Sequence, residues 1–225
     1  MVDANNEWTK AIASTSETNS VFRAEKKEIQ EWFDSRAQGY DERLKFLGYL
    51  SPKVGAKKLI EFLEQHKFGT DCRILDVGSG TGLVGDELKK LNYTNLDALD
   101  PSEKSNDVAR GKKLYNNIFV EFLGSDKQLS IQSNTYDAVI SIGVFSRGIV
   151  KAEGAMDEMV RVVKPGGLIC FSIREDVILD KEYGYEEKMA ELSDNKAWKL
   201  LSKTKEPYLP GYKECYMFVY QVLRE

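Results

Sequence analysis

The sequence predicts an α/β protein in which a mostly parallel sheet is covered by helices on both faces. Strand and helix signals alternate from Arg73 onward, as expected for consecutive strand–helix units. The run at residues 168–173 is apolar throughout, which is typical of a parallel strand that is buried on both faces. Two further strand signals, at 198–205 and 215–223, end the chain and are close enough to form an antiparallel hairpin.

Composition and charge limit the classes of function. The chain has 225 residues, 42% of them hydrophobic, and a net charge of -4, so we expect one globular domain without a basic surface for nucleic acid. No apolar run approaches about 18 residues, so no membrane span is expected. The start of the chain has no apolar signal region, and a cytoplasmic location is expected, with the nucleus as the alternative. His66 is the only histidine, and its spacing from the three cysteines matches no metal site.

The chain divides into three predicted regions. Residues 1–20 are polar and are expected to be a disordered tail. Residues 21–68 carry apolar side chains at helical spacing and should form two or three helices. Residues 69–225 hold the strand–helix units, with further strands at 95–100, 118–123 and 136–143, a helix that ends before Pro165, another at 185–197, and a terminal loop that contains Pro207, Pro210 and Gly211.

The first strand runs into a glycine-rich turn, Asp76-Val77-Gly78-Ser79-Gly80-Thr81-Gly82, and a helix follows. Such a turn allows a ligand to approach bare backbone at a helix N-terminus. A dinucleotide fingerprint would need a third glycine where Leu83 stands, which disfavours NAD or FAD. A phosphate loop would end in Gly-Lys-Ser/Thr, and a nucleophile elbow would have serine at its centre, so neither matches. An ordinary turn between a strand and a helix is the remaining alternative.

Asp100 ends the second strand, about 20 residues after the glycine turn. An acid at this place accepts hydrogen bonds from ribose hydroxyls in nucleotide-binding α/β folds. The alternative is a structural role, in which Asp100 caps the next helix and Pro101 occupies its first position.

These features occur in the order of a known family. The blocks at 76–82, 99–102, 124–126, 136–139 and 163–168, the last reading Val-Lys-Pro-Gly-Gly-Leu, resemble those of the class I S-adenosylmethionine-dependent methyltransferases. The segment 33–41 is similar to the lead of the ubiquinone-biosynthesis subset of that family. The resemblance implies a Rossmann-like sheet of seven strands, mostly parallel with an antiparallel last strand, and S-adenosylmethionine as cofactor.

The resemblance also implies a set of cofactor-binding positions. Where the family often has Gly-Asp to meet adenine, this chain has Ser125 followed by Asp126, so either residue can fill that role, and Asp126 can equally be a solvated loop acid. Ile142 and Gly143 would lie under the transferred methyl group or belong to the core, and Phe33 is expected in the core. Tyr40 would be part of a helical lid, 21–68, over the sulfonium, which aromatic rings attract. The full expected set is Tyr40, Asp76, Gly78, Ser79, Gly80, Gly82, Leu83, Asp100, Pro101, Ser102, Ser125, Asp126, Ile142 and Gly143.

The expected activity is methyl transfer to a small molecule or a protein side chain, not to nucleic acid. Aligning the acceptor with the sulfonium can supply most of the rate, so no dedicated catalytic residue is required. The fourth strand is followed by neither Asn/Asp-Pro-Pro-Tyr nor Pro-Cys, the boxes of base methyltransferases. A pseudo-enzyme that binds the cofactor without catalysis, or that activates a partner, is the main alternative, and a nicotinamide oxidoreductase is disfavoured by Leu83.

Overall fold

The computed structural model describes residues 26–124, 126–209 and 213–223. The expected tail at residues 1–20 and Ser125 therefore lie outside the described residues. Three helices come first: α2 (Lys26–Asp34), α3 (Tyr40–Phe46) and α4 (Ser51–Gln65). They agree with the helices expected between 21 and 68. No helix in the described ranges is long and apolar enough to cross a bilayer.

Strands and helices then alternate along the chain. Their bounds are β1 (Ile74–Val77), α5 (Leu83–Lys90), β2 (Leu96–Leu99), α6 (Glu103–Lys112), β3 (Ile118–Phe119), β4 (Tyr136–Phe145), α7 (Ala155–Val162), β5 (Val163–Arg174), α8 (Tyr185–Asp194), β6 (Trp198–Leu209) and β7 (Lys213–Val222). The strands form one sheet of seven in the order β3-β2-β1-β4-β5-β7-β6. Neighbours from β3 to β5 are parallel, while β7 is antiparallel to both β5 and β6. The expected fold class is confirmed.

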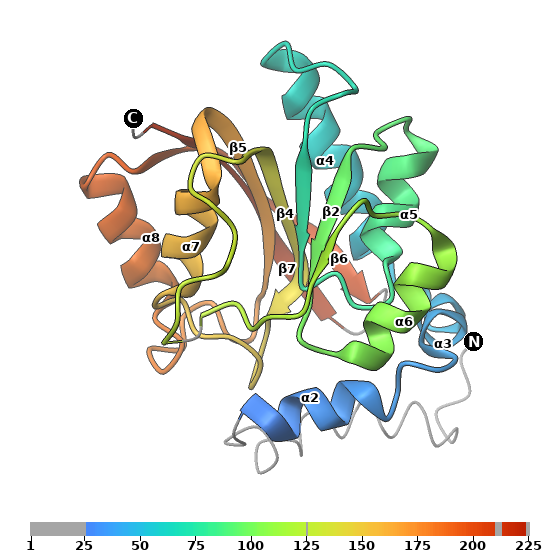
Figure 1. Cartoon of the computed structure of the whole chain (residues 1–225). Coiled ribbons are helices and arrows are strands. Elements are labelled where there is room, and N and C mark those ends of the chain that lie inside the picture. The colour runs from blue at the N-terminus through green and yellow to red at the C-terminus, as the bar shows by residue number, and fades with distance from the viewer. Residues whose placement is uncertain (1–25, 125, 210–212, 224–225) are drawn as a thin grey trace.

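Helices cover both faces of the sheet, α4 and α5 on one and α7 and α8 on the other (Figure 1). Alternate side chains of the central strand β4 enter the two cores: Ile140 and Ile142 pack with α4, whereas Val139 and Phe145 pack with α7 and α8. All four are nearly inaccessible to water. Burial on both faces explains why the central strands are apolar without alternation.

Several elements differ from the sequence prediction, and β5 begins at Val163, ahead of the expected start at residue 168. Strand β3 has only two residues, because the chain leaves the sheet edge after Phe119. Helix α8 ends at Asp194, before the expected end at residue 197. Pro207 was expected in the terminal loop, but it lies in β6 and pairs with Glu214 of β7. Proline has no backbone N–H group to donate. Because β6 is an edge strand with no neighbour on its outer side, proline is tolerated there.

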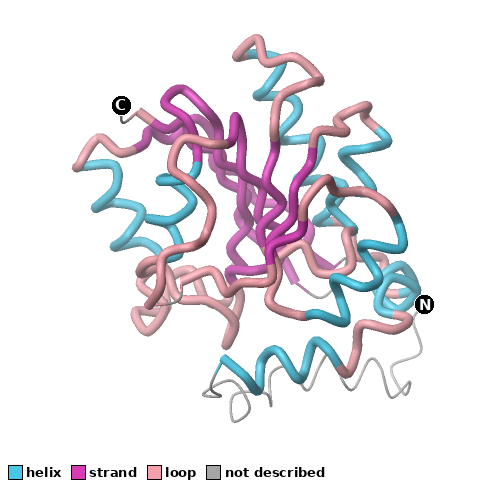
Figure 2. The backbone as a smooth tube through the Cα atoms, viewed as in Figure 1, coloured by secondary structure: helices cyan, strands magenta, loops and turns pink. Residues whose placement is uncertain are grey.

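The topology fixes where a ligand can bind. Strand β1 lies between β2 and β4, so the strand order reverses at this point. In parallel sheets a crevice forms at such a point, at the carboxyl ends of the strands. The loops that follow β1, β2 and β4 gather at that edge of the sheet, and α2 crosses beside them (Figures 1 and 2). The candidate site lies here.

Candidate functional site

The glycine turn after β1 forms one wall of a cavity. Gly78 and Gly80 have positive φ angles of 68° and 51°. A Cβ atom on Gly78 would lie 2.1 Å from Val144 Cγ2, so packing against β4 excludes any side chain at that position. A Cβ atom on Gly80 would meet nothing within 4 Å. The turn therefore presents bare backbone to open space, as a nucleotide-binding turn requires.

The cavity is bounded by the carboxyl ends of three strands and by the N-terminal helices. Nine of the predicted site residues line it: Tyr40, Gly78, Ser79, Gly80, Leu83, Asp100, Pro101, Ile142 and Gly143. The remaining wall is mostly apolar and comes from Ile29, Phe33, Leu44, Tyr49, Pro52, Thr81, Val84, Leu99, Ser105, Phe122, Leu123, Val144, Ile149, Val150 and Tyr208. Phe33, expected in the core, is part of that wall.

Asp100 connects two loops across the cavity floor. Its Oδ2 accepts a hydrogen bond from the Gly80 N–H at 2.8 Å, and its Oδ1 accepts one from the Ser102 N–H at 2.8 Å. Burial raises the pKa of this carboxyl to about 6, although the two backbone donors oppose the shift. Each oxygen keeps a further lone pair, so the carboxylate can still accept from a ligand hydroxyl.

Asp100 is not the N-cap of the next helix, which was the alternative role expected for it. The N-cap of α6 is Ser102, whose Oγ accepts from the Ser105 N–H at 3.1 Å. Pro101 therefore precedes the cap. Ser102 was expected to bind cofactor, but it does not line the cavity, and its hydroxyl donates to Asp34 at 2.6 Å.

Asp76 lies behind the glycine turn and does not line the cavity. Its Oδ2 accepts from the Tyr115 hydroxyl at 2.6 Å, and burial raises its pKa to about 7. Gly82 is likewise outside the lining, because it packs against Leu114 and Tyr115. Asp126 is exposed and also outside the lining. The structure thus places none of Asp76, Gly82 and Asp126 in the cavity wall.

The donor set fits a cofactor that has an adenosine and an amino acid portion. Ser79 Oγ is buried in the cavity wall and has no hydrogen-bond partner among the described residues. It joins the carboxylate of Asp100 and the open backbone of Gly80 on the same side of the cavity. A buried hydroxyl without a partner is costly, and a ligand polar group would satisfy it.

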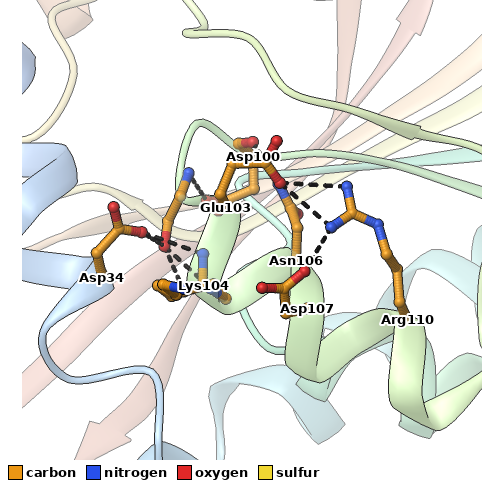
Figure 3. A network of polar contacts seen from close by, with 9 residues as sticks. Asp34, Asp100, Glu103, Lys104, Asn106, Asp107 and Arg110 are labelled. Carbon is orange, nitrogen blue, oxygen red and sulfur yellow. Dashed lines mark hydrogen bonds and ion pairs between the residues drawn. The ribbon is translucent and has the colours of Figure 1, made fainter.

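The N-terminal helices are tied to these same loops by two acids. Asp34, at the end of α2, accepts from Ser102 Oγ and from the Lys104 N–H at 3.2 Å, which brings it to the start of α6 (Figure 3). Asp41, on α3, accepts from Thr81 Oγ1 at 2.5 Å and pairs with Lys112 Nζ at 2.6 Å. These contacts of Asp34 and Asp41 join the N-terminal helices to the glycine turn and to α6.

Sequence reasoning missed two tyrosines of the wall, Tyr49 and Tyr208. Tyr49 lies in the connection between α3 and α4, and Tyr208 is near the end of β6. Neither position belongs to a motif. The only sequence signal is their aromatic character beside predicted loops, and it does not locate them in the cavity.

Comparisons with known proteins agree with this geometry. A family model described as a methyltransferase domain matches residues 75–171, which include the glycine turn, Asp100 and the end of β4. The human methyltransferase-like protein 27 is 33% identical over 143 residues, which are 64% of this chain and 56% of that protein. The matched part therefore spans little more than half of that relative.

A solved S-adenosylmethionine-dependent methyltransferase from Leishmania major shares the fold. Its TM-score is 0.65 at 16% identity, and the match covers 87% of this chain and 82% of that one. At this identity the likeness concerns the fold alone.

The expected exclusion of nucleic acid finds no support in the comparisons. A tRNA N(3)-methylcytidine methyltransferase from Schizosaccharomyces pombe is 36% identical over 107 residues, 44% of this chain and 35% of that protein. An acidic total charge does not decide the acceptor class, because the relevant charge is the local charge around the cavity mouth.

Proposed function

We propose that this chain, as a class I S-adenosylmethionine-dependent methyltransferase with S-adenosylmethionine as its cofactor, methylates a small molecule or a protein side chain. The observation that carries the proposal is the cavity itself. The glycine turn and Asp100 supply open backbone and a carboxylate, while most of the other described lining residues are aliphatic or aromatic. Such an arrangement suits a cofactor held on one side and an acceptor enclosed on the other.

Each wall has a separate role in this proposal. Asp100 accepts ribose hydroxyls, while Ser79 and the open backbone at Gly80 bind the amino acid portion of the cofactor. Ile142 and Gly143 form the floor at the point of transfer. The cofactor, when bound, supplies an electrophilic methyl group on a sulfonium.

The N-terminal helices act as a cover. Ile29, Phe33 and Leu44 face the cavity and exclude water, which strengthens the electrostatic interactions inside and limits hydrolysis. Alignment within a closed, apolar space can supply much of the rate, so the proposal needs no general base from this wall.

The test is to follow labelled methyl groups. The full chain is incubated with methyl-labelled S-adenosylmethionine and a cell extract, which is then separated into small molecules, protein and nuclease-sensitive RNA. Label in the first two fractions is expected, with Asp100→Ala as the control that should weaken cofactor binding and reduce the label. Label confined to the nuclease-sensitive fraction would refute the proposed acceptor. Cofactor binding without any transfer would instead favour the pseudo-enzyme.

A further inference from the structure

Three tyrosines line the part of the cavity wall that the N-terminal segment and β6 provide. Tyr40 begins α3, Tyr49 lies in the connection between α3 and α4, and Tyr208 is near the end of β6. All three line the cavity. The rings of Tyr49 and Tyr208 meet edge to face, with centroids 5.0 Å apart and an interplanar angle of 67°. We refer to these residues as the tyrosine cluster.

The hydroxyls of Tyr49 and Tyr208 lie over Gly143, at the carboxyl end of β4. A Cβ atom on Gly143 would be 2.7 Å from Tyr49 Oη and 3.4 Å from Tyr208 Oη. Gly143 occupies an irregularity in the pairing of β4 with β5, and its N–H donates to Ser172 Oγ at 3.0 Å. The two oxygens therefore converge on the place where the proposed function puts the transferred methyl group.

These phenols remain protonated and neutral at ordinary pH. Burial is the main reason that the pKa of all three hydroxyls is raised, and their mutual interactions raise the pKa of Tyr40 and Tyr49 further. A phenol that holds its proton so firmly is a poor general base. It retains oxygen lone pairs, however, and can accept a hydrogen bond from an N–H group.

The cavity offers no counter-charge to an anion. Among its described lining residues there is no lysine, arginine or histidine, and Asp100 is the only residue with an acidic or basic side chain apart from the tyrosines. The guanidinium of Arg174, which acts to lower the pKa of Tyr208, is paired with Asp176. A carboxylate or phosphate acceptor would be desolvated here without a cationic partner in the described lining.

An amine meets the conditions that this wall sets. Its nitrogen has a lone pair and needs no base to become a nucleophile once it is neutral. Its N–H groups can donate to the oxygens of Tyr49 and Tyr208. During transfer the positive charge passes from sulfur to nitrogen, and aromatic rings stabilise a cation at either place.

We propose that the acceptor is an amine and that Tyr49 and Tyr208 bind its nitrogen over Gly143. The nitrogen lone pair forms a bond to the methyl carbon while the carbon–sulfur bond breaks, and that bond's electron pair stays on sulfur, giving S-adenosylhomocysteine. The nitrogen becomes an ammonium, which releases one proton to water. This inference rests on the proposed function, because it needs the cofactor in the cavity.

The first test measures binding to the full chain saturated with S-adenosylhomocysteine. Calorimetry compares benzylamine with benzyl alcohol and benzoate, which have similar shape but a different polar group. Benzylamine should bind at least about tenfold more tightly than either. Nα-acetyl-lysine methylamide is the matched probe for a protein side chain, and whichever amine binds more tightly indicates a free or a protein-borne acceptor. If benzylamine binds no more tightly than benzyl alcohol or benzoate, or if neither amine binds detectably, the inference is overturned.

The second test places an amine at the point of transfer. In the cofactor analogue sinefungin, an amine-bearing carbon replaces the methyl-bearing sulfonium. Tyr49→Phe and Tyr208→Phe keep the rings but remove the hydroxyls, so each should weaken sinefungin by about threefold to tenfold while leaving S-adenosylhomocysteine unchanged. The matched control is Tyr216→Phe, because Tyr216 lies on β7 outside the cavity lining.

The outcomes separate the two proposals. If S-adenosylhomocysteine binds but the two variants bind sinefungin with the affinity of the wild type, the amine inference is wrong and the proposed function stands. If S-adenosylhomocysteine itself does not bind to the folded chain, the proposed function is wrong, and the inference falls with it.

Discussion

Asp100 shows how one side chain organises a site at the residue scale. Its two oxygens hold the backbone of Gly80 and of Ser102, so the glycine turn and the start of α6 are positioned by the same carboxylate. Buried backbone donors of this kind need a hydrogen-bond acceptor. The residue is therefore structural for two loops, and we propose that it is also the acceptor for the ribose.

Replacing Asp100 separates binding from capping. Asp100→Ala should weaken S-adenosylhomocysteine about 10- to 150-fold, because a hydrogen bond to a charged acceptor contributes about 1.5–3 kcal/mol. Ser102→Ala is the matched control, since it removes the actual N-cap of α6 and should cost about 1 kcal/mol of stability with little change in affinity. Calorimetry and thermal melting of both variants check this. Equal affinity losses in the two variants would mean that loop geometry alone determines binding.

Asp76 predicts a dependence of stability on pH. Burial raises the pKa of this carboxyl to about 7 in the folded protein, above the value of about 3.9 in the unfolded chain. The folded state therefore binds the proton more tightly, and the stability that protonated Asp76 contributes is lost as the pH rises through about 7.

Asp76→Asn removes this titration while retaining an oxygen that can accept from Tyr115. The free energy of unfolding of the variant should fall less than that of the wild type between about pH 5 and 8. Denaturant unfolding across this range measures the difference, and the other titrating groups are common to both proteins. If the free energies of unfolding of the two proteins depend on pH in the same way, Asp76 does not titrate in the folded state in this range.

At the scale of elements, the N-terminal helices and the cofactor loops form one unit. Asp34 and Asp41 join α2 and α3 to the start of α6 and to the glycine turn, and the apolar faces of these helices form part of the cavity wall. A ligand that orders the loops should therefore also order the helices. The expected lid is consistent with this arrangement and remains a proposal.

Hydrogen exchange with and without S-adenosylhomocysteine tests the cover. Backbone amides from about Trp32 to Asp41 should exchange more slowly when the ligand is present, because the loops that bind Asp34 and Asp41 become fixed. Helix α8 lies on another part of the sheet and serves as the internal control. Unchanged exchange at 32–41 would mean that α2 and α3 are a fixed appendage and that Tyr40 does not respond to the cofactor.

Whether a site residue could be predicted from the sequence depends on whether one element or several distant elements position it. The glycine turn and Asp100 could be located because both end buried strands at a characteristic separation, so a local pattern determines their place. Tyr49 and Tyr208 could not, because they meet only after β6 has folded back beside β7. The orientation of Asp76 was also hidden, since it depends on Tyr115 from a distant loop.

At the scale of the whole molecule, the order of the strands brings the parts together. Because β1 lies between β2 and β4, the glycine turn, Asp100 and Gly143 emerge at the same edge of the sheet although they are distant in sequence. The hairpin β6–β7 extends the sheet on the other side and carries Tyr208 back to that edge. In the proposed function, one half of the fold therefore supplies the cofactor wall, and the N-terminal helices and the hairpin supply the acceptor wall.

The cavity is expected to hold S-adenosylmethionine and not a nicotinamide dinucleotide. Calorimetric titration of the full chain with S-adenosylhomocysteine and, separately, with NADH tests it most directly. The glycine spacing, with Leu83 in place of a third fingerprint glycine, predicts saturable binding of S-adenosylhomocysteine at one site per chain and none of NADH. Saturable binding of NADH by a chain that does not bind S-adenosylhomocysteine would contradict the account.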